Sequence, residues 1–230
     1  MRIQAVAAGL VLLVPILVVT YPVIADDARS LAPAATNSSN VISANPATSD
    51  ADISSEEEIR RLFDLYRDAR YAGMLEEADT LAKRIVDLSI RANGIDSKTT
   101  AMALTNLAAL QSSIEDNVSA VQNFAQAIEI VERLESRLSS DLISPLRGMG
   151  AAYLLAGNAD HAQAAWNRAL HISHVNFGPH NFEQIETLYS LGRSFMNAGM
   201  TKEAIRVRKR ISFLRYRNAN SGSIGELPEP

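Results

Sequence analysis

Cysteine is absent from the 230 residues. This absence excludes disulfide bonds, thiolate metal sites, a cysteine nucleophile and lipidation on cysteine. A strong charge of one sign is also missing, because 22 Lys and Arg stand against 26 Asp and Glu, for a net charge of −4. No overall positive field therefore draws the chain to nucleic acid, and we expect no nucleic-acid partner.

Signatures of catalysis are missing as well. The chain has no Gly-x-Ser-x-Gly elbow, no Gly-x-x-x-x-Gly-Lys phosphate loop and no His-Glu-x-x-His metal motif. Clusters of carboxylates such as Glu76-Glu77 fall at expected helix starts, where the helix dipole favours them. The sequence therefore predicts a protein that is not an enzyme and that uses no cofactor.

Aromatic residues are scarce, at 6% of the chain with a single tryptophan. Much of the apolar content is alanine and leucine, which helix-on-helix packing favours. The hydrophobic fraction of 47% and the charged fraction of 21% are ordinary for a globular protein. The composition thus favours a helical fold with small side chains between the helices.

The strongest positive signal is a repeat of 42 residues. One repeat position holds glycine in three of four units, and another holds alanine in all four; the residues are Gly73, Glu115, Gly157 and Gly199, then Ala78, Ala120, Ala162 and Ala204. A third position holds a residue of changing size: Ala82, Phe124, Trp166 and Arg208. Four units in one register predict four helical hairpins. The hairpins must stack on one another, because a single hairpin cannot bury its own apolar stripe.

The third unit shows the packing logic most clearly. Gly150 lets a partner helix come close, Tyr153 fills the space one turn later, and Gly157 takes the turn between two helices. Ala162 is small where the second helix presses on the first, and Trp166 plugs the gap below it. Gly192 stands at the position of Gly150 in the fourth unit. This small and large alternation is typical of a helix–turn–helix hairpin of the tetratricopeptide (TPR) type.

The 42-residue unit is longer than the usual TPR unit of about 34 residues. With Phe177-Gly178-Pro179-His180-Asn181, Leu104-Thr105-Asn106-Leu107-Ala108 and Leu188-Tyr189-Ser190-Leu191-Gly192, it resembles the kinesin-light-chain-like branch of the TPR family. The resemblance implies an all-α, right-handed α-solenoid of about four hairpins. It also implies adaptors or scaffolds whose first helices, called A, line a groove for a protein or peptide. The asparagine repeated in that branch is matched only at Asn106, so a full ladder of peptide clamps is not expected.

Four regions follow from the pattern: a signal peptide at 1–25, a disordered linker at 26–55, a four-repeat domain at 56–217 and a disordered tail at 218–230. The signal has Arg2, an apolar core and Val23-Ile24-Ala25 before Asp26. An uncleaved membrane anchor is the alternative, since about 20 apolar residues can span a bilayer. We therefore expect a periplasmic or secreted protein, or one anchored by its N-terminus.

Two helix starts carry their own signals. Ser54 and Ser55 stand three residues before Glu57 and Glu58 and form overlapping capping boxes, so the first helix is expected to begin there. In the third unit, Ser144 as N-cap with Pro145 at the first helical position is the economical interpretation.

Candidate binding residues come from projecting the A helices onto the TPR pattern. The groove candidates are Arg67, Arg70, Asn106, Arg147, Tyr189 and Arg193. A basic patch on the last helix comprises Arg206, Lys209, Arg210 and Arg217. This patch is either a landing site for an acidic partner or an anionic membrane, or the polar end that a solenoid needs for solubility.

His171 and His174 lie on one helical face, but a two-histidine pattern favours surface residues, and we expect no metal site.

The sequence leaves three functions open. The first is an exported TPR adaptor that binds a protein or peptide partner. The second is a regulatory or auxiliary subunit of a cell-envelope enzyme or assembly complex. The third is a structural module that associates with copies of itself.

Overall fold

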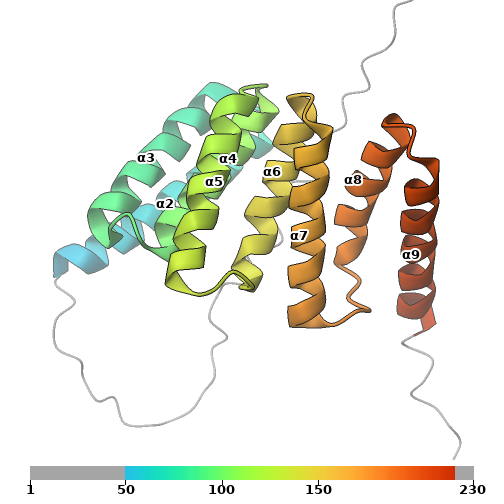
Figure 1. Cartoon of the computed structure of the whole chain (residues 1–230). Helices are drawn as coiled ribbons and strands as arrows, with labels where there is room; N and C mark the ends of the chain where they lie inside the picture. The colour runs from blue at the N-terminus through green and yellow to red at the C-terminus, as the bar shows by residue number, and fades with distance from the viewer. Residues whose placement is uncertain (1–49, 221–230) are drawn as a thin grey trace, which may run out of the picture. The chain divides into compact units, whose positions relative to one another are not determined.

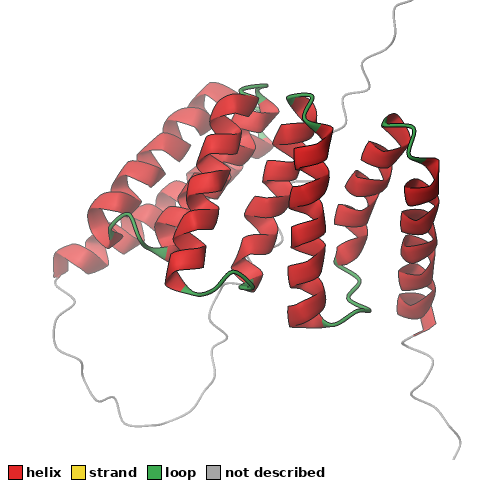
Figure 2. Cartoon of the chain, in the orientation of Figure 1, coloured by secondary structure: helices red, strands yellow, loops and turns green. Residues whose placement is uncertain are grey.

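The computed structural model describes residues 50–220, and the expected signal peptide, most of the linker and the last ten residues lie outside the described part. The described part contains eight α-helices, one short 3₁₀ helix and no strand (Figure 2). In chain order they are α2 (Asp50–Tyr71), α3 (Leu75–Asn93), α4 (Lys98–Ser113), α5 (Asn117–Leu134), η1 (Ser140–Leu142), α6 (Ile143–Leu155), α7 (Ala159–Phe177), α8 (Gln184–Asn197) and α9 (Thr201–Asn220) (Figure 1).

The helices form four antiparallel hairpins that stack in chain order. Each helix packs on the next one along the chain, and the A helices also approach each other, α4 with α6 and α6 with α8 (Figure 1). The second helices of the hairpins, called B, do not approach one another in this way. The A helices therefore form the more closely packed layer. The predicted all-α, right-handed solenoid of TPR hairpins is confirmed.

All four A-to-B turns share one backbone geometry. The residue at the turn has a positive φ in every hairpin: 74° at Gly73, 67° at Glu115, 80° at Gly157 and 71° at Gly199. In the third hairpin, Asn158 N donates to Tyr153 O at 2.8 Å and Gly157 N donates to Leu154 O at 3.0 Å. These two bonds make a Schellman motif, and the other three turns have the equivalent pairs. The turn is thus set by backbone geometry, and Glu115 adopts it without being glycine.

A left-handed conformation costs a residue with a Cβ about 1–2 kcal/mol, whereas glycine adopts it freely. We therefore expect Glu115→Gly to raise the free energy of unfolding by about 0.5–1 kcal/mol, the remainder being lost to glycine's greater freedom when unfolded. The matched reverse change, Gly157→Ala, should lower it by about 1 kcal/mol. Urea unfolding measures both. A stabilised Gly157→Ala variant would contradict this account of the turns.

Small residues let neighbouring helices approach closely, both within a hairpin and between hairpins. Ala78, Ala120 and Ala162 are completely buried, and Ala204 is 6% exposed. Two glycines of α6 each lie under a ring: a Cβ at Gly148 would stand 2.3 Å from Phe124, and one at Gly150 would stand 2.4 Å from Trp166. In the fourth hairpin a Cβ at Gly192 would meet Val207 at 3.2 Å, a looser contact.

Two expected helix starts are wrong. The first helix begins at Asp50, so residues 50–55 of the expected linker are helical, because no proline or glycine interrupts the chain between Asp50 and Ser55. In the third hairpin, α6 begins at Ile143 rather than after Ser144, with η1 directly before it. Pro145 is tolerated because it lies in the first turn, where backbone N–H groups have no partner within the helix. At the other end α9 continues to Asn220, three residues beyond the expected boundary.

Membrane-spanning character is not found in the described helices. None of the helices between residues 50 and 220 combines the length and the apolar content that crossing a bilayer requires.

Candidate functional site

The exposed side of the A helices, which we call the helix A face, holds the predicted groove residues. Arg67, Ala109, Ala151 and Arg193 occupy one repeat position on this face; the two arginines are exposed and the two alanines are half-buried. The middle of the face therefore has a floor of small residues, with arginines at both ends. A segment of a partner could approach the backbone most closely at the alanines.

Side chains at the N-terminal end of this face are held by α2 and α4. Tyr66 is buried, and its hydroxyl donates to the carbonyl oxygen of Asn106 at 2.9 Å. The guanidinium of Arg70 lies 5.8 Å from the centre of the Tyr66 ring. Burial raises the pKa of Tyr66, and the charge of Arg70 and its hydrogen bond to the tyrosine partly offset this rise. Arg67 pairs with Asp64 at 2.9 Å on its own helix. The candidates Arg67, Arg70 and Asn106 thus lie together, around a neutral tyrosine.

Arg147 is largely enclosed, with 18% of its side chain exposed. Its guanidinium makes an ion pair with Glu186 of α8, which joins the third hairpin to the fourth. The backbone carbonyl of Arg147 also accepts a hydrogen bond from Trp166 Nε1 at 3.2 Å. Arg147 therefore already has an internal partner, and sequence reasoning missed that partner. The signal was available, since Glu186 is an opposite charge on the same face of the next A helix.

The C-terminal end of the helix A face carries Tyr189 and Arg193, both exposed. The guanidinium of Arg215, from α9, lies 5.3 Å from the centre of the Tyr189 ring. A cation over an aromatic face is attracted by the ring quadrupole. Tyr189 therefore offers one edge of its ring to a partner while α9 supports the other side.

The last helix presents a mixed surface at the end of the stack. Arg208, which occupies the position of Trp166, is exposed, while Val207, Ile211 and Leu214 are buried against the preceding helices. The polar side chains of Arg208, Ser212 and Arg215 are exposed, and so is the apolar side chain of Ile205, at 45%. Ile205 has the repeat position of Gln163, which contacts Ser194 of the following hairpin.

The four residues of the predicted basic patch do not share one environment. Arg206 and Arg210 line a cleft between α7, α8 and α9, whereas Lys209 is exposed and does not line it. Arg210 donates a hydrogen bond to the carbonyl of Pro179, which ties α9 to the loop before α8. We call this the outer cleft, because the B helices α7 and α9 form its walls. One part has a volume of about 510 Å³, and a second part of about 330 Å³ adjoins it through Leu170, Leu188 and Arg210.

His171 and His174 line the outer cleft. Between residues 50 and 220 no group of three or more His, Cys, Asp or Glu side chains is placed to hold a metal ion. Sequence reasoning did not find the cleft, because its lining comes from three helices and its shape depends on how two consecutive hairpins pack.

Comparison with known proteins identifies the class of fold. No protein-family model matches the chain, and no curated protein matches its sequence. Solved structures do match, and they show a TPR-like repeat protein.

Three solved structures illustrate the similarity. BtubC from P. vanneervenii has a TM-score of 0.61 and 22% identity, over 72% of this chain and 64% of BtubC, so the chain spans less than two thirds of that protein. The TPR-like repeats of a Podosopora anserina kinesin light chain, in a point-mutant form, have a TM-score of 0.63 and 16% identity, over 70% of this chain and 76% of the other. Rap protein, solved in complex with Competence and Sporulation Factor, has a TM-score of 0.60 and 13% identity, over 69% of this chain and 43% of Rap.

Proposed function

We propose that the chain is a non-catalytic scaffold that binds a protein or peptide along the helix A face. The observation that carries the proposal is the floor of Ala109 and Ala151 between exposed arginines, on a solenoid of TPR hairpins. Small residues let a partner's backbone approach, and arginine and tyrosine are favoured contact residues at interfaces. A similar fold holds a partner in the Rap complex, which supports the proposal by analogy of fold.

The proposed setting is outside the cytoplasm. Residues 1–25 have the charged start, apolar core and small-residue cleavage pattern of an export signal, and they support a periplasmic or secreted adaptor. N-terminal sequencing of the protein recovered from its native cells tests this part: a chain that begins near Asp26 supports export with cleavage, and an intact N-terminus contradicts cleavage.

A long charged side chain in the floor should block the partner. We expect Ala151→Arg to keep the fold and to reduce recovery of the partner at least about tenfold, a loss of about 1.4 kcal/mol in binding. The matched control is Ala125→Arg, an exposed alanine of α5 in the B layer. The measurement is quantitative co-purification from the native envelope, followed by titration of the recovered partner. Equal recovery with both variants would contradict binding at the helix A face.

A regulatory or auxiliary subunit of an envelope enzyme would use the same face. The same co-purification distinguishes the two roles, because an enzyme recovered with the chain can be assayed with and without it. A change in that enzyme's rate on adding the chain supports the regulatory role, and an unchanged rate supports an adaptor.

A further inference from the structure

The outer cleft lacks an ion pair that, one repeat earlier, bridges the two neighbouring B helices. There, Arg168 of α7 makes an ion pair with Glu132 of α5, which bridges two B helices. A step of 42 residues replaces Arg168 by Arg210 and Glu132 by His174. Arg210 and His174 both line the cleft between α7 and α9. The carboxylate that joins two neighbouring B helices in the earlier repeat is thus replaced by a histidine, which lies beside Arg210 in the outer cleft.

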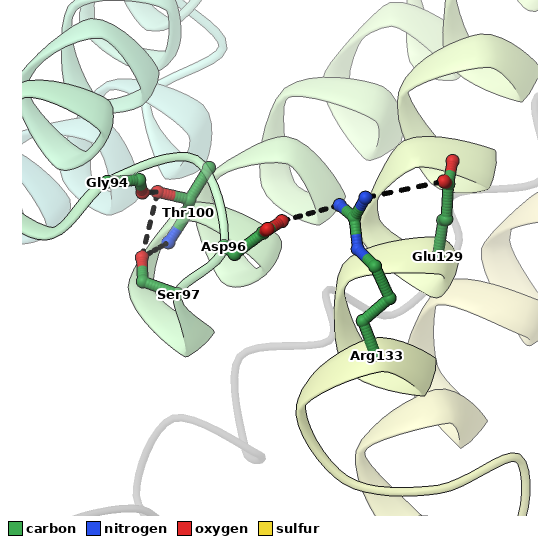
Figure 3. Close-up of polar contacts among 6 residues, drawn as sticks. All are labelled: Gly94, Asp96, Ser97, Thr100, Glu129 and Arg133. Atoms are coloured by element: carbon green, nitrogen blue, oxygen red, sulfur yellow. Dashed lines mark hydrogen bonds and ion pairs between the residues drawn. The ribbon is translucent and has the colours of Figure 1, made fainter.

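A second carboxylate is replaced at the loop beside the cleft. In the connection between the first two hairpins, Arg133 pairs with Asp96 at 2.5 Å and with Glu129 at 3.5 Å (Figure 3). Two repeats later these three positions hold Arg217, His180 and Phe213.

The charges around His180 show the sign of the local potential. Partial desolvation lowers the pKa of the His180 imidazole, and the positive charges of Arg217, Arg210 and His174 lower it further. Glu203 is the one acidic side chain among the residues that line the two parts of the cleft. The rim of the outer cleft is therefore electropositive.

The packing of the cleft also differs from that of the preceding repeat. Between α5 and α7 the helix η1 touches both B helices, and its Leu142 is completely buried. The connection between α7 and α8 contains no helix, and Gln184, the first residue of α8, takes the position of Leu142. Gln184 donates to the carbonyl of Gly178 at 3.1 Å, so its polar end turns back to the loop. The apolar side chains of Leu170 and Leu188 consequently line an open cleft.

We propose that the outer cleft is a second binding site, for an acidic peptide segment with an aliphatic residue between its carboxylates. The aliphatic side chain lies on Leu170 and Leu188, and the carboxylates pair with Arg206 and Arg210. The carboxylate on Arg210 takes the role that Glu132 has on Arg168 one repeat earlier, and Arg206 is a further cation that has no counterpart in the earlier repeats. The combined volume falls in the usual range for binding clefts, roughly 300–1,000 Å³. The site is distinct from the helix A face, since none of the residues named for that face lines the cleft, although α8 contributes to both.

A peptide fits this geometry better than a membrane surface does. Leu170 and Leu188 line an open, concave surface between α7, α8 and α9, against which a single side chain packs more closely than a flat bilayer does. Arg206 and Arg210 line the cleft together with these apolar residues. The cleft therefore presents arginine side chains and apolar surface to the same short peptide segment.

The test uses the full chain and a fluorescein-labelled peptide, Gly-Glu-Leu-Glu-Leu-Glu, titrated by fluorescence anisotropy at low salt. We expect saturable binding that Arg206→Glu weakens at least about tenfold, because a like charge replaces a pairing cation. The matched control is Arg208→Glu, which removes the same charge from the same helix outside the cleft. We expect this control to change the affinity less than about twofold. The charge-swapped peptide, Gly-Lys-Leu-Lys-Leu-Lys, should bind better to Arg206→Glu than to the wild type.

A second variant restores the internal carboxylates. The double change His174→Glu and His180→Asp recreates the charge pattern of the earlier repeats, so it should remain folded by circular dichroism and should weaken peptide binding at least about tenfold. An unchanged affinity in both Arg206→Glu and this double variant would overturn the proposal, as would an equal loss in Arg208→Glu. If Arg206→Glu abolishes co-sedimentation with phosphatidylserine vesicles but leaves the peptide titration unchanged, the rim contacts membranes and the proposal is wrong.

Discussion

Replacing Trp166 with alanine is expected to lower the free energy of unfolding by about 3–5 kcal/mol, as is typical for truncating a buried tryptophan. Trp166 is 2% exposed. Its indole covers Gly150, and its Nε1 donates to the carbonyl of Arg147. The change therefore opens a cavity between α6 and α7 and also removes the hydrogen bond that joins the two helices at Arg147. For a domain of this size the melting temperature should fall by roughly 6–20 °C.

The repeat supplies matched controls for this result. Phe124 is equally buried at the same repeat position but has no polar atom, so Phe124→Ala should cost less than Trp166→Ala. Arg208→Ala, at the same position on the exposed end, should change stability by less than about 0.5 kcal/mol. Thermal and urea unfolding of the three variants measure the order. A larger loss in Phe124→Ala than in Trp166→Ala would show that the tryptophan does not hold the third hairpin together.

Gly150→Ala is the second change with a large expected effect. The new Cβ would lie 2.4 Å from Nε1, 2.7 Å from Cδ1 and 2.8 Å from Cε2 of Trp166, so the rigid indole must move. Overpacking of this kind costs about 1–3 kcal/mol. Alanine also has a helix propensity about 1 kcal/mol better than glycine, which offsets part of the loss. We therefore expect a net loss of up to about 2 kcal/mol.

Two comparisons separate the steric effect from helix propensity. At Gly192 a Cβ would meet Val207 at 3.2 Å, and Gly192→Ala should be close to neutral, because a small shift of that side chain relieves the contact. In a background of Trp166→Ala the clash disappears, and Gly150→Ala should then stabilise the protein. The double-mutant cycle measures this coupling between α6 and α7. If Gly150→Ala is harmful in both backgrounds, its cost does not come from the indole.

The second connection, which differs from the other two, explains why one expectation failed. Gly94 and Gly178 end the B helices of the first and third hairpins with positive φ, but Ser136 stands at this position in the second. The second connection instead runs through η1 into α6. A proline was expected to mark the start of α6, yet the helix begins two residues before it. Proline is unfavourable in the interior of a helix, so Pro145 indicates that a helix begins nearby. It does not determine which position of the first turn the proline occupies.

The sequence by itself determined the repeat period, the turns and the close contacts within each hairpin. These features depend on residues near each other in the chain: a positive φ favours glycine, and Ala162 and Gly150 are small where two consecutive helices meet. Even Glu115 was placed at its turn by register alone, although its residue type is unfavourable there.

Only the tertiary structure decided which charges find partners between hairpins. The ion pair of Arg147 with Glu186 and the bond from Arg210 to Pro179 join segments that lie more than 30 residues apart. Their formation depends on the path of each connection and on the distance between helices, and neither follows from periodicity. The outer cleft arises in the same way: η1 and its buried Leu142 lie between α5 and α7, whereas the connection from α7 to α8 contains no helix and the polar Gln184 takes the position of Leu142.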